Sequence, residues 1–234
     1  MKYGKIVLAG VFLLIFITSC KRSLRGKGPI EVRSIQVSDF SKIRLEIPAD
    51  VTIVIADSFN CAITSQANII DAVKVDVSGN ELTISSDYNF DDTNIEMVIS
   101  LPGLKQVAIN GSGNMKTLNV IKSKTLKLYI NGSGSMDIDA EADKILAEIN
   151  GSGSCKINGS AKSFDCNING SGDLHGFDLA SIESQVEING SGDAEVMATD
   201  LLDASIRGSG NIIYKGSPHL KSEIVGSGTI KKSE

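Results

Sequence analysis

The tripeptide Gly-Ser-Gly recurs seven times in the second half of the chain, and this repeat limits the folds that the sequence can adopt. The triplets begin at residues 111, 132, 151, 170, 190, 208 and 226, so successive copies lie 18 to 21 residues apart. They contain 14 of the 17 glycines that follow residue 110. Such a period is typical of repeat proteins, in which each unit buries its apolar face only by stacking on its neighbours.

Segments of alternating polarity flank each triplet. The residue two positions before the first glycine is isoleucine in every copy. The residue three positions before this glycine is mostly polar, and the residue four positions before it is mostly small or apolar. After the triplet, a polar residue again precedes an apolar one. A period of two predicts a β-strand on each side of the turn, with the isoleucines inside. This core ladder comprises Ile109, Ile130, Ile149, Ile168, Ile188, Ile206 and Ile224.

These units predict an all-β fold, a β-solenoid with about 18 to 21 residues per coil, in which equivalent strands of successive coils pair in parallel. The two glycines of each triplet would supply a positive φ or a close backbone approach at a corner that a Cβ atom would block. These turn residues are Gly111, Gly113, Gly132, Gly134, Gly151, Gly153, Gly170, Gly172, Gly190, Gly192, Gly208, Gly210, Gly226 and Gly228.

An asparagine stands directly before each of the first five triplets. Asparagines at equivalent positions of stacked coils predict a ladder of side-chain amides that hydrogen-bond from coil to coil. The members of this ladder are Asn110, Asn131, Asn150, Asn169 and Asn189. Arg207 and Val225 replace asparagine in the last two copies, which indicates that the end of the stack is built differently.

The first half of the body lacks the triplet but keeps the alternation. Strand, turn, strand units surround the turns Pro48-Ala49-Asp50 and Ser78-Gly79-Asn80, and a further strand leads into Leu101-Pro102-Gly103. We expect residues 30–108 to form irregular β-coils that cap the regular solenoid of residues 109–234. A separate small β-sandwich over residues 30–105 is the alternative. No segment shows a convincing helical period.

The chain begins like a bacterial lipoprotein precursor. Lys2 and Lys5 precede an apolar run over residues 6–17, which is too short to span a bilayer as a mature helix. The run ends in Thr18-Ser19-Cys20, which resembles a lipobox. We expect residues 1–19 to be a cleaved lipoprotein signal peptide and Cys20 to be the lipidated first residue, which anchors the protein to a membrane without spanning it. A plain secretory peptide with an incidental cysteine is the alternative.

Residues 20–29 combine the lipidated cysteine with a basic segment. Lys21, Arg22, Arg25 and Lys27 occur here without any acidic residue. We expect a flexible tether that lies near anionic lipid head groups, with a merely solvated linker as the alternative.

The composition excludes several kinds of function. The chain has no tryptophan, 5% aromatic residues and two histidines, so aromatic platforms and His-rich metal sites are disfavoured. Its net charge is −5, and 17 basic and 28 acidic residues follow position 28. This acidic body argues against nucleic acid as a partner. We expect no cofactor.

No group of residues indicates catalysis. The turns are short, and no coil carries the long loops that would wall a cleft, so we expect a protein that is not an enzyme. A polysaccharide-acting β-helix enzyme is the remote alternative. His175 and His219 are expected in solvated turns rather than as metal ligands. Asp173 and Asp193 follow only two of the seven triplets, so surface acid is favoured over a calcium site of the β-roll type.

Three cysteines remain once Cys20 is lipidated. Cys155 and Cys166 fall on predicted inward positions of one coil, and Cys61 lies in the first half of the body. We expect buried free thiols, with a bridge between Cys155 and Cys166 as the alternative.

Several segments together resemble one known family. They are the lipoprotein leader, Arg33 followed by Phe40-Ser41-Lys42-Ile43, then Gly79-Asn80-Glu81-Leu82-Thr83-Ile84, and Leu101-Pro102-Gly103-Leu104 before the repeated Ile-Asn-Gly-Ser-Gly. Over about residues 30–230 the chain resembles the putative auto-transporter adhesin head, or GIN, domain proteins of Bacteroidetes envelopes. This resemblance implies a right-handed parallel β-helix and offers no catalytic residues. Because the adhesin label is itself inferred from the fold, it says little about function.

Two functional classes remain. The first is an adhesin-like binding rod whose partner is a glycan, a matrix component or another envelope protein, and the second is a structural or assembly factor on the periplasmic side of the envelope. We expect a lipid anchor in the outer membrane. Surface-bound Bacteroidetes lipoproteins often carry an acidic stretch after the cysteine, whereas this one is basic, so we favour the periplasmic face. The oligomeric state is left open.

Overall fold

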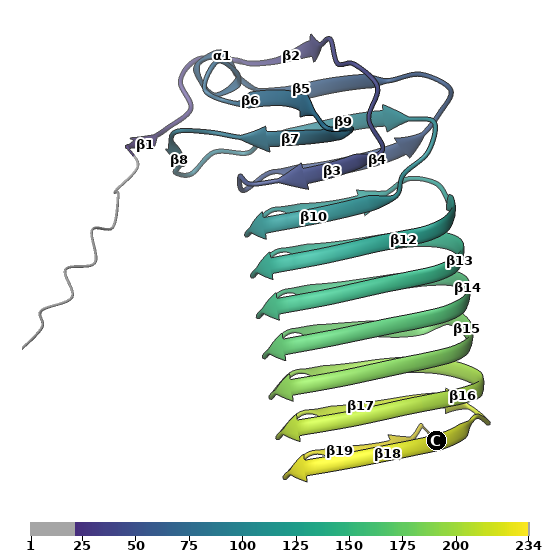
Figure 1. The fold of residues 1–234 in the computed structure, drawn as a ribbon. Coiled ribbons are helices and arrows are strands. Elements are labelled where there is room, and N and C mark those ends of the chain that lie inside the picture. Colours follow the sequence, from purple (N-terminus) through teal and green to yellow (C-terminus); the bar gives the residue numbers. More distant parts are fainter. Residues whose placement is uncertain (1–21, 234) are drawn as a thin grey trace, which may run out of the picture.

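A computed structural model describes residues 22–233 of the chain. The signal peptide predicted over residues 1–19 and the predicted lipidation site, Cys20, lie outside these residues. The described part is a β-solenoid of about seven turns (Figure 1). Nearly all of its strands join one 17-stranded sheet, and β1 and β8 form a separate pair. No helix between residues 22 and 233 is long and apolar enough to cross a membrane.

The regular part begins at residue 106 and stacks one coil on the next. Its strands are β10 (Gln106–Gly111), β11 (Asn114–Thr117), β12 (Ile121–Gly132), β13 (Ser135–Gly151), β14 (Ser154–Gly170), β15 (Asp173–Gly190), β16 (Asp193–Gly208), β17 (Asn211–Gly216), β18 (His219–Gly226) and β19 (Thr229–Lys232). All pairings between these strands are parallel. The sequence repeat therefore corresponds to one structural coil.

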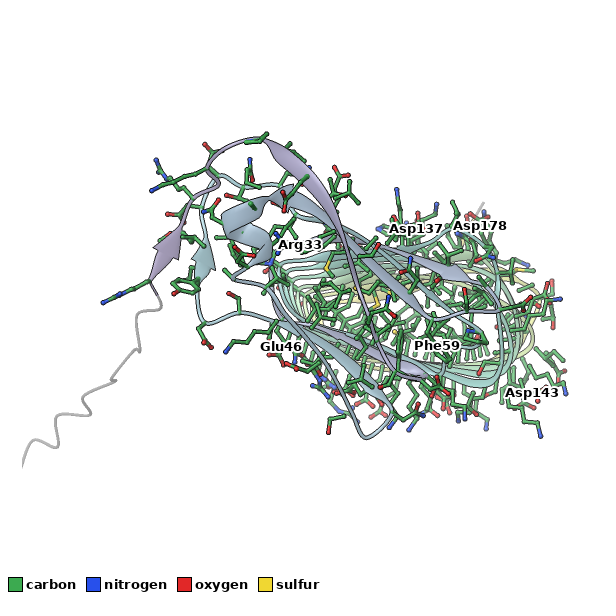
Figure 2. The ribbon with its side chains drawn as sticks, turned by 90° about the horizontal axis from the view of Figure 1, so that it is seen from above. Arg33, Glu46, Phe59, Asp137, Asp143 and Asp178 are labelled. Carbon is green, nitrogen blue, oxygen red and sulfur yellow. The ribbon has the colours of Figure 1, made fainter. Side chains whose placement is uncertain are left out.

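The register of the coils follows the triplets. Ile149 pairs with Ile168, and Gly151 pairs with Gly170, as the sequence spacing predicts. Viewed along the stack, the coils superimpose in an elongated outline, with Asp143 at one narrow end (Figure 2). The interior is filled by aliphatic side chains, and Phe164 is the largest side chain that is fully buried.

The isoleucine ladder is buried as far as the sixth coil. Ile109, Ile130, Ile149, Ile168, Ile188 and Ile206 are each at most 1% exposed. The expectation of a buried residue is wrong for the last member, because Ile224 is 43% exposed. Ile224 pairs with Ile206 on one side, but no further strand of the described chain covers its other side.

The N-terminal strands form a cap with a different topology. They are β1 (Ser23–Leu24), β2 (Ile30–Ile35), β3 (Lys42–Leu45), β4 (Asp50–Ile55), β5 (Asn60–Gln66), β6 (Lys74–Ser78), β7 (Glu81–Ser85), β8 (Asn89–Phe90) and β9 (Glu96–Leu101), with the one-turn helix α1 (Ala67–Ile70) between β5 and β6. Strands β3 and β4 continue the solenoid by pairing in parallel with β10 and β11. Strands β7 and β9 then pair with β3 and β4 on the side away from the solenoid.

The spatial order of the cap is thus the reverse of its chain order. The segment 81–101 precedes β10 in sequence, yet the earlier segment 42–55 lies between them. Antiparallel strands complete the cap, since β6 pairs with β7, and β5 with both β9 and β2. The turn at Gly79 and Asn80, whose φ angles are 57° and 68°, therefore closes a hairpin rather than the corner of a coil.

The predicted flexible tether is attached to the cap from Arg22 onward. Ser23 and Leu24 pair with the start and end of β8. The Lys27 amide donates a hydrogen bond to Asn68 Oδ1 at 2.8 Å, and Asn68 Nδ2 donates to the Arg25 carbonyl at 2.9 Å. These contacts differ from the expectation of a flexible tether, and they hold the chain against the cap from the third residue after Cys20.

Candidate functional site

The glycine turns carry the two structural roles expected of them. The first glycine of each triplet has a positive φ, for example 136° at Gly132 and 127° at Gly151. A Cβ atom on Gly132 would also lie 2.4 Å from the carbonyl oxygen of Gly111 in the preceding coil. The second glycine, Gly134, faces the core, where a Cβ atom would lie 2.7 Å from Ile109 Cγ2. These turns are therefore packing features and leave little room for a ligand.

The asparagines before the triplets form the predicted ladder. Each Nδ2 donates to the Oδ1 of the asparagine one coil earlier, at 2.9, 2.9, 2.9 and 3.2 Å along the series from Asn131 to Asn189. At the next coil, Arg207 instead donates to Glu187 of the preceding coil. The ladder thus stabilises the stack, and its last step is an ion pair.

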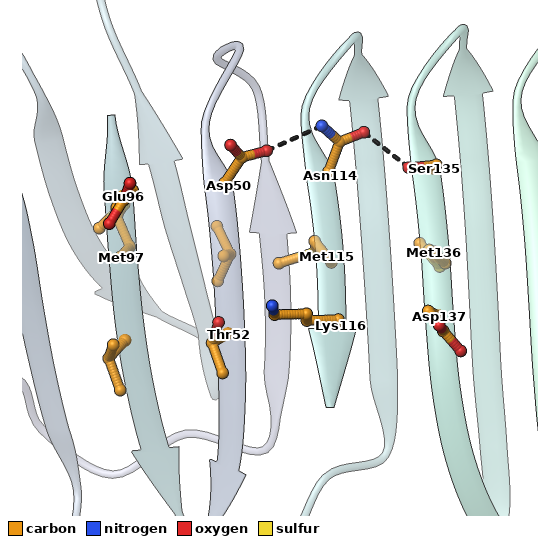
Figure 3. A pocket seen from close by; sticks show the side chains of 12 residues that line it. Asp50, Thr52, Glu96, Met97, Asn114, Met115, Lys116, Ser135, Met136 and Asp137 are labelled. Atoms are coloured by element: carbon orange, nitrogen blue, oxygen red, sulfur yellow. Dashed lines mark hydrogen bonds between the residues drawn. The ribbon is translucent and has the colours of Figure 1, made fainter. Parts of the chain in front are cut away.

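The candidate binding site is a groove where the cap meets the solenoid. It has a volume of about 470 Å³ and is lined by residues 96–98, 50–52, 114–116 and 135–137. These segments follow one another across four adjacent strands, β9, β4, β11 and β13 (Figure 3). We call the outward surface of these segments, and of the equivalent segments in later coils, the exit face, because each segment leaves a turn of the stack.

One row of polar side chains crosses the groove. Asn114 Nδ2 donates to Asp50 Oδ1 at 2.8 Å, and Ser135 Oγ donates to Asn114 Oδ1 at 2.6 Å (Figure 3). Glu96 stands beside Asp50 in the strand register and extends this row. The hydrogen bonds fix the Asn114 amide. Glu96 Oε1 already accepts from Asn94 Nδ2 at 2.8 Å, so Asp50 Oδ2 and Glu96 Oε2 remain as acceptors among the groove residues.

A second row contributes a cation and an apolar surface. Lys116 lies between Thr52 and Asp137 in the register of the same face. Val98, beside Thr52, is 46% exposed. The groove therefore presents acceptors, an ammonium donor and an apolar patch on a rigid sheet, a combination suited to binding a hydroxyl-rich ligand.

The loop after β11 shapes this region. Strand β11 ends at Thr117, whereas the equivalent strand β13 continues to Gly151. Asn119 ties the intervening loop to the cap, because its Oδ1 accepts from the Ile55 amide and its Nδ2 donates to the Ile55 carbonyl, both at 2.8 Å. The groove was not predicted from the sequence. Its only signal was the 21-residue spacing between the first two triplets, the longest of the series.

The three cysteines of the described chain are buried free thiols. Burial raises the pKa of Cys155 to about 12, with a smaller contribution from the charge of Asp137. Burial also raises the pKa of Cys61 to about 11 and holds the pKa of Cys166 well above its usual value. Thiols that remain protonated near neutral pH are poor nucleophiles and poor metal ligands.

Asp173, Asp193 and His175, which were considered for metal binding, have other partners. Asp173 Oδ1 accepts from the Asp193 amide at 3.2 Å, and Asp193 Oδ1 accepts from the Asn211 amide at 2.8 Å. His175 lies within β15 rather than in a turn and contacts Glu195 at 3.3 Å. Between residues 22 and 233 there is no group of three or more His, Cys, Asp and Glu side chains that could hold a metal ion.

The stacked parallel coils, the glycine corners and the antiparallel cap define a β-solenoid repeat protein. The chain belongs to the family described as "Putative auto-transporter adhesin, head GIN domain", whose model matches residues 39–218. This confirms the resemblance drawn from the sequence motifs. No curated protein matches the chain at a significant level.

Solved structures from Bacteroides and Parabacteroides share this fold. A putative adhesin from Bacteroides fragilis is 25% identical with a TM-score of 0.86, over 90% of this chain and 100% of that one. A structure described as a putative lipid binding protein from Parabacteroides distasonis is 27% identical with a TM-score of 0.79, over 91% and 100%. A putative adhesin from Parabacteroides merdae is 26% identical with a TM-score of 0.73, also over 91% and 100%.

Proposed function

We propose that this protein is a non-enzymatic, lipid-anchored binding rod of the cell envelope, which engages a glycan through the groove between cap and solenoid. The groove carries the proposal, because it brings polar and apolar groups from four strands together on one rigid surface. The adhesin names of the family and of its structural neighbours agree with a binding role. They are not evidence for a particular ligand.

The chemistry of the groove favours a carbohydrate over an apolar ligand. Sugar hydroxyls donate to carboxylates and accept from ammonium groups, and the C–H face of a sugar ring packs on exposed apolar side chains. Asp50, Glu96 and Lys116 supply the polar groups, and Val98 supplies the apolar surface. The backbone pairing of β9, β4 and β11 fixes their spacing before a ligand arrives, which lowers the entropic cost of binding.

The membrane attachment is proposed to be a lipid at Cys20 in the outer membrane. The sequence before Cys20 supports cleavage and acylation, and the basic residues Arg22, Arg25 and Lys27 suit anionic head groups. We favour the periplasmic face on the basic charge of this segment. Protease treatment of intact cells tests the location, because surface protein is digested and periplasmic protein is protected.

A glycan array probed with residues 21–234 tests the binding function. We expect Glu96→Gln and Lys116→Ala to weaken binding of the selected glycan about tenfold, since each removes a hydrogen-bonding charge. Glu195→Gln and Lys231→Ala are matched controls, because these residues occupy the register position of Asp137 on the exit face, three and five coils further along the stack. Binding reduced equally by both sets would reject the groove. No glycan binding, combined with full protease protection, would favour the structural or assembly class instead.

A further inference from the structure

The C-terminal end of the solenoid is an open sheet edge on both faces of the stack. Within residues 22–233, β18 pairs only with β16, and β19 pairs only with β17. The outer edge of each strand therefore presents main-chain N–H and C=O groups without a neighbouring strand (Figure 1). The other end of the molecule is built differently, because antiparallel strands close the cap there.

The last coil also leaves core positions uncovered. Ile224 occupies the ladder position of Ile206, which is completely buried, yet Ile224 is 43% exposed. Leu220 and Ile230, which pair with the buried Leu202 and Ile212, are only partly buried. A further strand with apolar residues at alternate positions would cover these side chains as each earlier coil covers its predecessor.

The charge of this end is opposite to that of the rest of the body. Residues 211–234 contain four lysines, Lys215, Lys221, Lys231 and Lys232, and two acidic residues, Glu223 and Glu234. Residues 29–210 contain 13 basic and 26 acidic residues. The edge strands β18 and β19 hold three of the four lysines. The edge therefore attracts acidic chains, while most of the molecule repels them.

We propose that this edge binds an extended, acidic segment of a partner protein by strand addition, so that the segment continues the solenoid beyond β18 or β19. Main-chain hydrogen bonds would supply the pairing, apolar side chains would cover Ile224 or Ile230, and carboxylates would face Lys221 or Lys231. Unpaired main-chain groups together with an apolar row favour a peptide over a polysaccharide, which could satisfy the charges but not the pairing.

The same lysines argue against a second copy of this chain as the occupant. Two C-terminal edges brought together would place like charges opposite each other, and lysine on an edge strand is a common protection against self-association. The Lys232 ammonium, 3.3 Å from Ser217 Oγ, adds a further positive charge to this end. An acidic strand would not be repelled by these lysines, so the edge favours a negatively charged partner over a second copy of this chain.

The position of the edge fits this role. Strand β1, which follows Cys20 by three residues, belongs to the cap end, and the whole solenoid lies between the cap and β18 (Figure 1). If lipid holds the cap at the membrane, the open edge is the part of the rod farthest from the anchor. The edge is also separate from the groove, so the two binding proposals succeed or fail independently.

The test uses residues 21–234 and a fluorescent eight-residue peptide in which glutamate and valine alternate. We expect saturable binding by anisotropy and slower amide hydrogen exchange in β18 or β19. The double variant Lys221→Glu/Lys231→Glu should weaken binding at least tenfold. The matched control Lys127→Glu/Lys156→Glu reverses two outward-facing charges in earlier coils and should bind the peptide as the unaltered protein does.

Four comparisons test the proposal further. A peptide with proline at two central positions keeps its carboxylates but cannot complete the pairing, and it should bind at least tenfold more weakly. Equal binding of this peptide, or of heparin, would show charge attraction without strand addition and overturn the proposal. The proposal is also overturned if both double variants lose binding equally. Sedimentation showing that the chain dimerises through this edge would likewise replace the acidic partner with a second copy.

Discussion

Gly153 lies directly against Ile130 of the preceding coil, and a Cβ atom on the glycine would lie 2.5 Å from Ile130 Cγ2. It would also lie 2.6 Å from the carbonyl oxygen of Gly134. The isoleucine ladder and the second glycine of the triplet are therefore one packing unit. Ile130 stands two residues before the turn of its own coil, and its side chain fills the space beside the turn of the next coil. Residue 153 in that next turn must therefore be a glycine.

This contact predicts that Gly153→Ala destabilises the fold. The added methyl group meets both a buried side chain and backbone, so we expect the free energy of unfolding to fall by about 2 to 3 kcal/mol. Chemical denaturation measures the change. Gly103→Ala is the control, because a Cβ atom at Gly103 has no neighbour within 4 Å. A loss at Gly153 no larger than at Gly103 would contradict the packing argument.

The isoleucine ladder predicts different costs at its middle and its end. Ile149→Asp places a carboxylate without a partner at a side chain that is 1% exposed, and we expect a loss of more than about 4 kcal/mol or complete unfolding. Ile224→Asp should cost about 1 kcal/mol or less, because its side chain already meets solvent. Circular dichroism during thermal unfolding compares the two. Similar melting temperatures for both variants would refute the ladder.

The asparagine ladder predicts a pH-dependent defect in Asn150→Asp. Asn150 Nδ2 donates to Asn131 Oδ1 at 2.9 Å and to Glu148 Oε1 at 2.8 Å, and a carboxylate would replace both hydrogen bonds by repulsion. We expect a loss of about 2 kcal/mol at pH 7. The loss should shrink near pH 3, where a protonated carboxyl group can donate again.

Asn167→Asp serves as the control for this experiment. Asn167 lies in the adjacent strand β14, outside the ladder, and pairs with Glu148 in the register. Its side chain makes no hydrogen bond within residues 22–233. We expect it to add charge repulsion without breaking a ladder bond. An equal and pH-independent loss in both variants would assign the effect to surface charge alone.

The buried thiols predict a stability that falls at alkaline pH. A thiol whose pKa is raised to about 12 in the folded state, as at Cys155, stays protonated while an unfolded thiol with its usual pKa near 9 loses its proton. The unfolded state then binds fewer protons, so the buried Cys155 thiol lowers the stability by about 1.4 kcal/mol for each pH unit between these two pKa values. Urea denaturation at pH 8 and pH 10 measures this slope, and Cys155→Ala should reduce it.

Alkylation offers an independent check on the same thiols. In native protein at pH 8, iodoacetamide should label none of Cys61, Cys155 and Cys166, because all three are buried and protonated. In urea it should label all three. Rapid labelling of the native protein would show that one of the thiols opens to solvent.

The sequence predicts the structure well where the chain repeats. Identical residues at a fixed spacing reveal which strands pair and in which register, so the parallel coils and the Asn131 to Asn110 ladder bond followed directly. The triplets also located the corners, because only a glycine tolerates the positive φ seen at Gly132 next to the Gly111 carbonyl. In the regular coils, the residues that recur along the sequence are the residues that pair between strands, so the repeat alone predicts the long-range pairing.

The pairing of the cap strands does not follow from the sequence pattern. Alternation predicted strands near Ile43 and Leu82 but could not show that β7 pairs with β3, because neither strand carries a register mark. The groove could not be predicted either, because Glu96, Asp50 and Asn114 come together only through these non-local strand pairings. The exposure of Ile224 depends on whether another strand covers it. The repeat pattern is the same at Ile224 as at the buried Ile206, so it does not predict this difference.

The direction of the hydrogen bonds between coils determines how the rod responds to force. The strands lie across the stack, so the hydrogen bonds from coil to coil run along its axis. A pulling force between an anchored cap and a partner bound at β18 would therefore act on one coil interface at a time. Each interface would then open like a zipper rather than slide in shear. One detached coil of 18 residues would release about 60 Å of chain, so the molecule would limit tension by lengthening stepwise before its cap is disturbed.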